Sequence, residues 1–216
     1  MRNLIDTMGA SARLTREVIW DPFSPYIPIV RRDFSLLPRP GFVGSNWQSG
    51  GYALIGSNGN STEGRPEASR EYEAQDSDHA ELIRSFRDGP NDANFRSLMD
   101  FERNDILRWS LRSTIDQVLH RLDTSLDDVA VLNVIPFSTL TSPGASSPVW
   151  RNSVALHLAP LLNSLQPERI IWLGKAASRG VRPHAHLLPG CVSHIMSRQR
   201  NLSWSEKLND VPVMKH

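Results

Sequence analysis

Three nearly continuous apolar runs constrain the fold of this chain more than any other feature of its sequence. They cover residues 51–60, 129–139 and 169–177, and each ends in polar side chains. Runs of this kind are typical of parallel strands that are buried by helices on both faces of a sheet. In such sheets ligands bind beyond the carboxyl ends of the strands. We expect Asn58, Asn133 and Lys175 to lie there.

The segments around these runs predict helices and a fourth strand. Apolar residues recur three and four apart over residues 104–122 and over 148–165, and the Ser-Pro pair at 147–148 is a typical helix start. A fourth strand is expected at 191–196 and a terminal helix at 203–208. This alternation predicts a three-layer α/β/α sandwich around a central four-stranded, mainly parallel sheet.

Length and composition indicate one globular domain. The chain has 216 residues, of which 39% are hydrophobic, and this is enough for a sizeable core. Residues 1–50 contain many prolines and glycines, so we expect a short helix and an extended arm packed on residues 51–216. The polar segment 57–78 is expected to be a loop, and a loop of this length is usually functional or disordered.

The cysteine content excludes several cofactors, whereas the net charge excludes no class of partner. The net charge of +1 argues neither for nor against DNA. The single cysteine, Cys191, excludes an internal disulfide and a four-cysteine iron–sulfur cluster. His184, His186 and Cys191 lack zinc-site spacing, so we expect no metal and no cofactor. Because no run has the length of a signal peptide or a membrane span, we expect a cytoplasmic protein without a membrane partner.

Two polar motifs at the predicted strand ends carry most of the functional information. Residues 56–60, Gly-Ser-Asn-Gly-Asn, stand where a phosphate loop could lie but lack its Gly-Lys-Ser/Thr ending. Their structural alternative is an ordinary turn after a strand. Asn133 follows the most hydrophobic run, where an amide needs hydrogen-bond partners. A bound ligand would supply them; the alternative is an asparagine that caps its own strand end.

The order and content of these runs resemble the uracil-DNA glycosylase superfamily over residues 50–205, most closely its G-x-N-P-G branch. On this resemblance Asn58 matches the water-positioning asparagine, and Asn133 matches the base-recognising one. Residues 172–177 are similar to the family strand that ends in Leu-Gly-x-x-Ala, whereas Gly59 replaces the proline of the branch. The base pocket that the resemblance implies is formed at these strand ends by Asn133, Gly56, Gly59 and Asn60.

The fourth predicted strand and the residues after it match the family only in part. Ser197 fits the serine of its H-P-S or M-P-S motif, Met196 replaces the proline, and His194 lies one residue farther than the usual histidine. The resemblance implies that His194 stabilises the departing base anion; the alternative is a core histidine. The expected DNA contacts come from small and basic residues near the strand ends: Ser138, Lys175, Ser197, Arg198 and Arg200.

The resemblance implies a DNA glycosylase that flips a pyrimidine and hydrolyses its N-glycosidic bond, and we expect it to be monomeric and monofunctional. Asn58 would hold the attacking water. An amide cannot take a proton from that water, so Glu63 or Glu67 would have to assist. The aromatic side chain that stacks on the base is left open among Tyr72, Phe86 and Phe137.

The substrate prediction depends on the absence of a side chain that would block the C5 position of the pyrimidine. Uracil-specific members of the family carry a proline and then an aromatic ring that blocks pyrimidine C5, and this chain has Gly59 and Asn60 there. We therefore expect excision of a C5-modified pyrimidine, such as the hydroxymethylated or glucosylated cytosine of phage DNA, in defence against phages. The alternatives are uracil repair, a catalytically inactive DNA- or nucleotide-binding module of the same fold, and a hydrolase of free nucleosides or nucleotides.

Overall fold

The computed structural model describes residues 1–19, 37–60, 70–107, 112–139, 147–190 and 192–196, and only the backbone of 58–60, 70–76, 138–139 and 195–196. Its centre is a five-stranded sheet in the order β1-β3-β2-β4-β5. The strands are β1 (Phe42–Val43), β2 (Tyr52–Asn60), β3 (Val129–Thr139), β4 (Arg169–Leu173) and β5 (Val192–Met196). β1 is antiparallel to β3, and the other neighbouring strands are parallel.

The mostly parallel sheet confirms the predicted α/β class. β2, β3, β4 and β5 coincide with the four predicted strands. The expected number of four strands is nevertheless one too few. β1 has only two residues, Phe42 and Val43, and a run this short has no periodicity that a sequence could reveal. Both residues are buried against β3.

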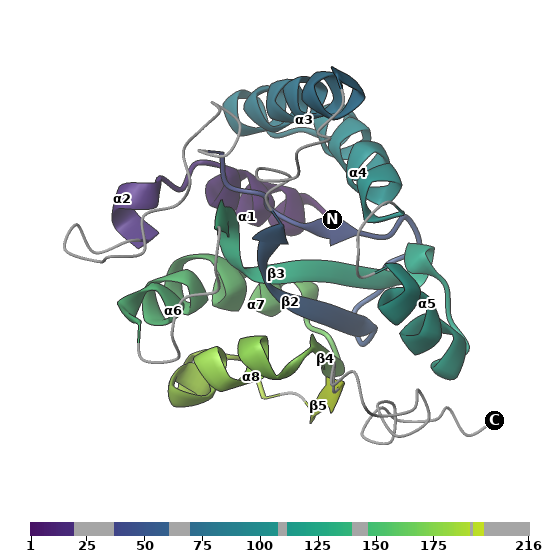
Figure 1. Cartoon of the computed structure of the whole chain (residues 1–216), viewed down its shortest axis with the longest axis vertical. Helices are drawn as coiled ribbons and strands as arrows, with labels where there is room; N and C mark the ends of the chain where they lie inside the picture. The colour runs from purple at the N-terminus through teal and green to yellow at the C-terminus, as the bar shows by residue number, and fades with distance from the viewer. Residues whose placement is uncertain (20–36, 61–69, 108–111, 140–146, 191, 197–216) are drawn as a thin grey trace.

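The helices either precede β1 or connect the parallel strands (Figure 1). They are α1 (Arg2–Ala12), α2 (Arg16–Ile19), α3 (Arg70–Asp88), α4 (Asp92–Ile106), α5 (Arg112–Arg121), α6 (Pro148–Ser153), α7 (Ala159–Leu165) and α8 (Lys175–Val181). The chain runs from β2 through α3, α4 and α5 to β3, then through α6 and α7 to β4, and through α8 to β5. Across the sheet the parallel strands lie in the order β3-β2-β4-β5. Numbered by their place along the chain, they are the second, first, third and fourth parallel strands.

The second predicted helix is confirmed, with one irregularity. Ser147 caps it, since its Oγ accepts the N–H of Val149 at 3.4 Å, and a proline occupies the first helical position. The helix ends before Gln166, which has a left-handed backbone conformation. A π-helical turn at Val154–Leu158 separates α6 from α7. Such turns are rare and often occur at functional sites.

Two predictions for the first half of the chain are wrong. The single helix expected over 104–122 is instead the end of α4 and the whole of α5. The loop expected over 57–78 contains the last residues of β2 and the first half of α3. The first half of α3 is hard to detect because its sequence is mostly polar, whereas the described residues of its second half include the buried Ile83 and Phe86. The terminal helix expected at 203–208 lies outside the described residues.

α1 contributes directly to the core. Leu4, Ile5 and Met8 are buried, and the helix packs against both α3 and α7. Thr7 and Ser164 join α1 to α7 through their hydroxyl oxygens, which lie 2.7 Å apart. Within the part of the chain that the structure describes, no helix combines the length and the apolar character needed to cross a membrane.

Candidate functional site

β2 and β3 continue together past the end of β4. β4 ends at Leu173, one residue after Trp172, which pairs with Ile55 of β2. The pairs beyond Ile55 are Gly56↔Asn133, Asn58↔Ile135 and Asn60↔Thr139, with a register shift before the last pair. In Figure 1 both strand ends bend towards the side where α1 and α3 lie. The motif at 56–60 is therefore paired strand and not the expected loop, because β3 continues alongside it.

The Asn133 side chain lies over Gly56 at this end of the sheet. A Cβ atom on Gly56 would come within 2.6 Å of Asn133 Oδ1, so only glycine leaves room for the amide. Asn133 is 8% exposed, and no group in the described residues makes a hydrogen bond to its side-chain amide. Nearly buried polar groups normally have partners. This amide is therefore available to recognise a ligand.

The backbone of Asn133 is held by a histidine that the sequence analysis missed. Nε2 of His157, in the π-helical turn, lies 3.1 Å from the Asn133 carbonyl oxygen. Nδ1 of the same ring lies 2.5 Å from Ser11 Oγ in α1. Burial lowers the pKa of the His157 imidazole to about 4, although the hydrogen bond to Asn133 acts in the opposite direction. The available signal was a histidine within the apolar stripe of a predicted helix.

The sheet does not bring His194 to Asn133. His194 lies inside β5, where it pairs with Ile171 of β4, so β2 and β4 separate it from β3. Three strand spacings correspond to about 14 Å. His194 Nε2 is buried and has no hydrogen-bond partner among the described residues. The predicted contact between His194 and a base held by Asn133 is therefore not supported by this geometry.

The motif with Lys175 makes the turn from β4 into α8. Gly174 has a φ of +113°, a conformation that favours glycine, and it precedes the first helical residue, Lys175. Lys175 is exposed and Ala177 is buried, so the motif places a cation at the surface next to the carboxyl end of β4. This is the place we expected for a phosphate contact.

The other predicted residues are placed only in part. Gly59, Asn60 and Ser138 lie in the paired ends of β2 and β3, where the structure describes the backbone for Asn60 and Ser138. The predicted residues outside the described part of the chain are Glu63, Glu67, Ser197, Arg198 and Arg200.

Burial reduces the number of aromatic side chains that could stack on a base. Phe86 and Phe137 are completely buried, and Phe86 packs against Phe95 with ring centroids 6.1 Å apart. Neither ring is open to a base in this conformation. Tyr72 belongs to the part of α3 for which only the backbone is described.

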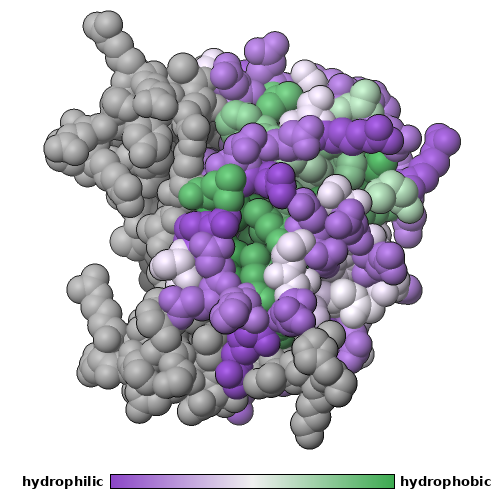
Figure 2. All heavy atoms as spheres, turned by 90° about the vertical axis from the view of Figure 1, so that its right-hand side faces the viewer, coloured by the Kyte–Doolittle hydropathy of each residue, from purple (hydrophilic) through white to green (hydrophobic). Residues whose placement is uncertain are grey.

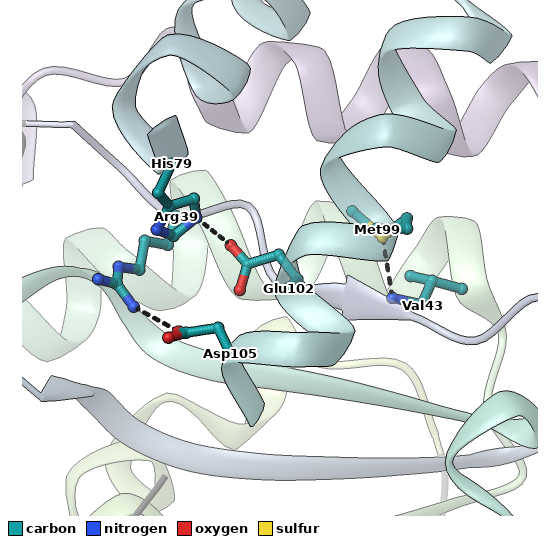
Figure 3. A network of polar contacts seen from close by, with 6 residues as sticks. All are labelled: Arg39, Val43, His79, Met99, Glu102 and Asp105. Carbon is teal, nitrogen blue, oxygen red and sulfur yellow. Dashed lines mark hydrogen bonds and ion pairs between the residues drawn. The ribbon is translucent and has the colours of Figure 1, made fainter. Parts of the chain in front are cut away.

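A second polar cluster joins α3, α4 and the segment before β1 (Figure 3). His79 Nε2 lies 2.6 Å from Glu102 Oε1, and both side chains are buried. Arg39 binds Asp105 at 3.3 Å and donates its backbone N–H to the Pro136 carbonyl of β3 at 2.7 Å. Burial raises the pKa of Glu102, but the charges of His79 and Arg39 outweigh burial and hold that pKa below its usual value. The cluster thus fastens two helices to the carboxyl-terminal part of β3.

A groove of about 840 Å³ lies elsewhere, between α1, α4 and β1. Its lining includes the apolar residues Phe42, Val43 and Met99 and several charged side chains. Figure 2 shows an apolar strip between hydrophilic side chains on this side of the molecule. The groove is near the amino end of β3, because Asp127 also lines it, and none of the predicted site residues does. The strand ends around Asn133 are therefore the better candidate site.

Neither metal ligation nor similarity to known proteins identifies the site further. The described residues contain no group of three His, Cys, Asp or Glu side chains that could hold a metal ion. The chain matches no protein-family model and no curated protein. The resemblance to the uracil-DNA glycosylase superfamily therefore rests on the quoted motifs and stays a prediction.

Proposed function

We propose that this protein is a DNA glycosylase that recognises a flipped pyrimidine with the side-chain amide of Asn133. One observation carries the proposal: the amide lies nearly buried over Gly56, with no hydrogen-bond partner among the described residues. Parallel sheets with the strand order second, first, third, fourth bind ligands at the carboxyl ends where the connections diverge to opposite faces. In this sheet the connections diverge between β2 and β4, so the end of β2 borders that place and Asn133 of β3 lies one strand away from it.

An asparagine suits the Watson–Crick edge of a pyrimidine because its amide offers one donor group and one acceptor group. On extrusion from the duplex, a base loses its pairing and stacking partners, so the pocket must replace them. Asn133 would accept from and donate to the base edge. The backbone of Gly56, next to it in β2, would form the adjacent wall.

The reaction that we propose is hydrolysis of the N-glycosidic bond. The bond from the sugar C1′ to the base nitrogen breaks, and the base leaves with the electron pair. Water adds its oxygen to C1′ and gives up a proton, which a carboxylate must accept because an amide is not basic. Asn58 lies two residues beyond Gly56 in β2 and would orient this water, with Glu63 or Glu67 as the base. We assign no step to His194, since two strands separate it from β3.

The proposal includes a monomer with a three-layer arrangement that binds duplex DNA. Lys175 at the start of α8 would contact a phosphate from the protein surface. The further contacts proposed come from Ser138, Ser197, Arg198 and Arg200.

The proposed substrate is a C5-modified pyrimidine, for example hydroxymethylated or glucosylated cytosine in phage DNA. The support is the absence of a proline and an aromatic ring at Gly59 and Asn60, where such a ring would block C5. Excision of uracil is the alternative substrate. A DNA-binding module without catalysis is a second candidate function, and the pairing of Asn58 within β2, instead of in a free loop, favours it.

The test uses matched duplexes that carry uracil, thymine, 5-hydroxymethylcytosine or glucosylated 5-hydroxymethylcytosine at one position. We expect release of the C5-substituted base, detected by mass spectrometry, and a matching abasic site that alkali cleaves. Asn58→Ala should lose base release and keep DNA binding, because its proposed partner is the water. Release of uracil alone would contradict the modified-base substrate. DNA binding without release from any duplex would favour the non-catalytic module.

A further inference from the structure

We infer that His157 is a positioning residue for the proposed base-reading Asn133, and that Ser11 holds His157 in one tautomer. The inference rests on the proposed function for its catalytic consequence, but not for its geometry. Ser11, His157 and Asn133 come from α1, the π-helical turn and β3, and all are buried. Ser11 and His157 are 146 positions apart in the chain, so only the folded protein brings them together.

The Asn133 carbonyl needs this partner because the edge strand stops too early to provide one. Gly44 donates its N–H to the Val129 carbonyl, and Phe42 pairs with Val131. Alternate carbonyls of β3 face the β1 side, so the Asn133 carbonyl faces that side too. If the register of β1 continued, Pro40 would lie opposite Asn133, and proline has no N–H to donate. A buried carbonyl left in this way is costly.

His157 satisfies this carbonyl, and the contact determines its tautomer. A carbonyl oxygen can only accept, so the proton of the neutral imidazole must be on Nε2. Nδ1 then carries a lone pair and accepts the hydroxyl proton of Ser11. The π-helical turn at Val154–Leu158 packs on β3 and carries the ring that reaches this carbonyl.

Two contacts therefore place Asn133. His157 holds its backbone, and the absence of a Cβ on Gly56 leaves room for its amide. Catalytic geometry is sensitive to displacements of about 1 Å, which can cost about 100-fold in rate. Loss of the His157 contact should therefore shift the amide and slow base release more than it weakens DNA binding.

The experiment compares His157→Leu, which cannot donate, with His157→Gln, whose amide can. Thr7→Val is the matched control, because it removes a hydroxyl contact of α1 with α7 without touching Asn133. Single-turnover base release and DNA affinity are measured for each variant that retains the wild-type circular dichroism spectrum. We expect base release to fall about 10- to 100-fold in His157→Leu, with partial rescue in His157→Gln and little change in Thr7→Val.

Two NMR measurements test the geometry without any activity. The imidazole nitrogen shifts of His157 should show a neutral ring protonated on Nε2. The Asn133 side-chain amide signals, assigned by their loss in Asn133→Ala, should move in Ser11→Ala and His157→Gln and stay in place in Thr7→Val. A ring protonated on Nδ1, or Asn133 signals that do not move in either variant, would overturn the inference.

The two sets of measurements separate this inference from the proposed function. If the wild type releases no base from any duplex but the Asn133 signals move as expected, the proposed function fails and the positioning role stands. If the wild type is active and His157→Leu releases base as fast as Thr7→Val, the catalytic consequence of the positioning role is wrong.

Discussion

At the scale of single residues, the positions of Gly56 and Asn133 depend on each other. The side chain of Asn133 occupies the space that a Cβ atom on residue 56 would need. The pair lies where β2 and β3 pass beyond β4, and the amide it accommodates has no partner among the described residues. A glycine in the interior of a strand costs stability, so its presence here is explained by the side chain packed over it.

We predict that Gly56→Ala reproduces the loss of base release in Asn133→Ala. The new methyl group would lie 2.6 Å from Oδ1, so the amide must rotate or move away. The accompanying loss of stability should be about 1–3 kcal/mol, as is typical of overpacking. The measurements are base release and urea unfolding. Gly190→Ala is the control, because a Cβ there meets nothing within 4 Å; equal release by Gly56→Ala and Gly190→Ala would contradict the prediction.

Asn133→Ala itself should weaken binding of the flipped base by about 1–3 kcal/mol, the usual cost when buried partners are lost. We expect this loss only with duplexes that carry a substrate base, measured against the same duplex without it. An equal loss with both duplexes would show that Asn133 contributes to folding or to general DNA binding instead of base recognition.

At the scale of elements, the cluster of His79, Glu102, Arg39 and Asp105 joins α3 and α4 to the segment that leads into β1 (Figure 3). Arg39 also binds the backbone of β3 at Pro136, next to the extended strand end. The cluster therefore connects the helices after β2 to the same part of β3 that carries the candidate site. Its two buried members, His79 and Glu102, bind each other, which indicates a structural role.

We predict that Glu102→Ala destabilises the protein by about 3–5 kcal/mol, because it leaves the buried His79 without its carboxylate partner. Glu102→Gln should cost less, since its amide oxygen still accepts from His79 Nε2. Glu17→Ala is the matched control, because its ion pair with Arg16 is exposed and should contribute nothing measurable. Urea unfolding of the three variants checks the order; equal stability of Glu102→Ala and Glu17→Ala would refute it.

At the scale of the whole molecule, two buried groups make stability depend on pH in the same direction. The pKa of His157 is lowered to about 4 in the folded protein from its ordinary 6.5, and the pKa of Glu102 is also lowered. The unfolded chain therefore binds more protons than the folded one as the pH falls. Stability from His157 is fully present above pH 6.5 and is lost as the pH falls to about 4, and Glu102 adds to the loss below about pH 4.5.

We predict a plateau of unfolding free energy above about pH 6.5 and a decline below it, with a contribution from His157 on the order of 3 kcal/mol. His157→Gln removes the titrating ring, so its decline between pH 6.5 and 4.5 should be shallower. Chemical denaturation across this range measures both proteins. A parallel decline in the wild type and in His157→Gln would show that the ring does not titrate as expected.

The four parallel strands and the helix after Ser147 could be predicted from the sequence alone. Their signals are local: long apolar runs, a regular helical spacing and a Ser-Pro start. The sequence also singled out Asn133, because an amide at the end of the most hydrophobic run stands out from its neighbours. The pairing of residues 57–60 and the helix α3 could not be predicted in the same way, since the polar residues there gave no periodicity.

Only the tertiary structure decided what surrounds Asn133. The pairing of residues 56–60 with β3 depends on how far β3 extends, and the two-residue β1 exists only because β3 offers it an edge. The contacts of Asn133 with Gly56 and His157 join segments that are far apart in the chain. The strand order, in turn, keeps His194 away from them. Such contacts arise from packing and strand order, which no local pattern of residue types contains.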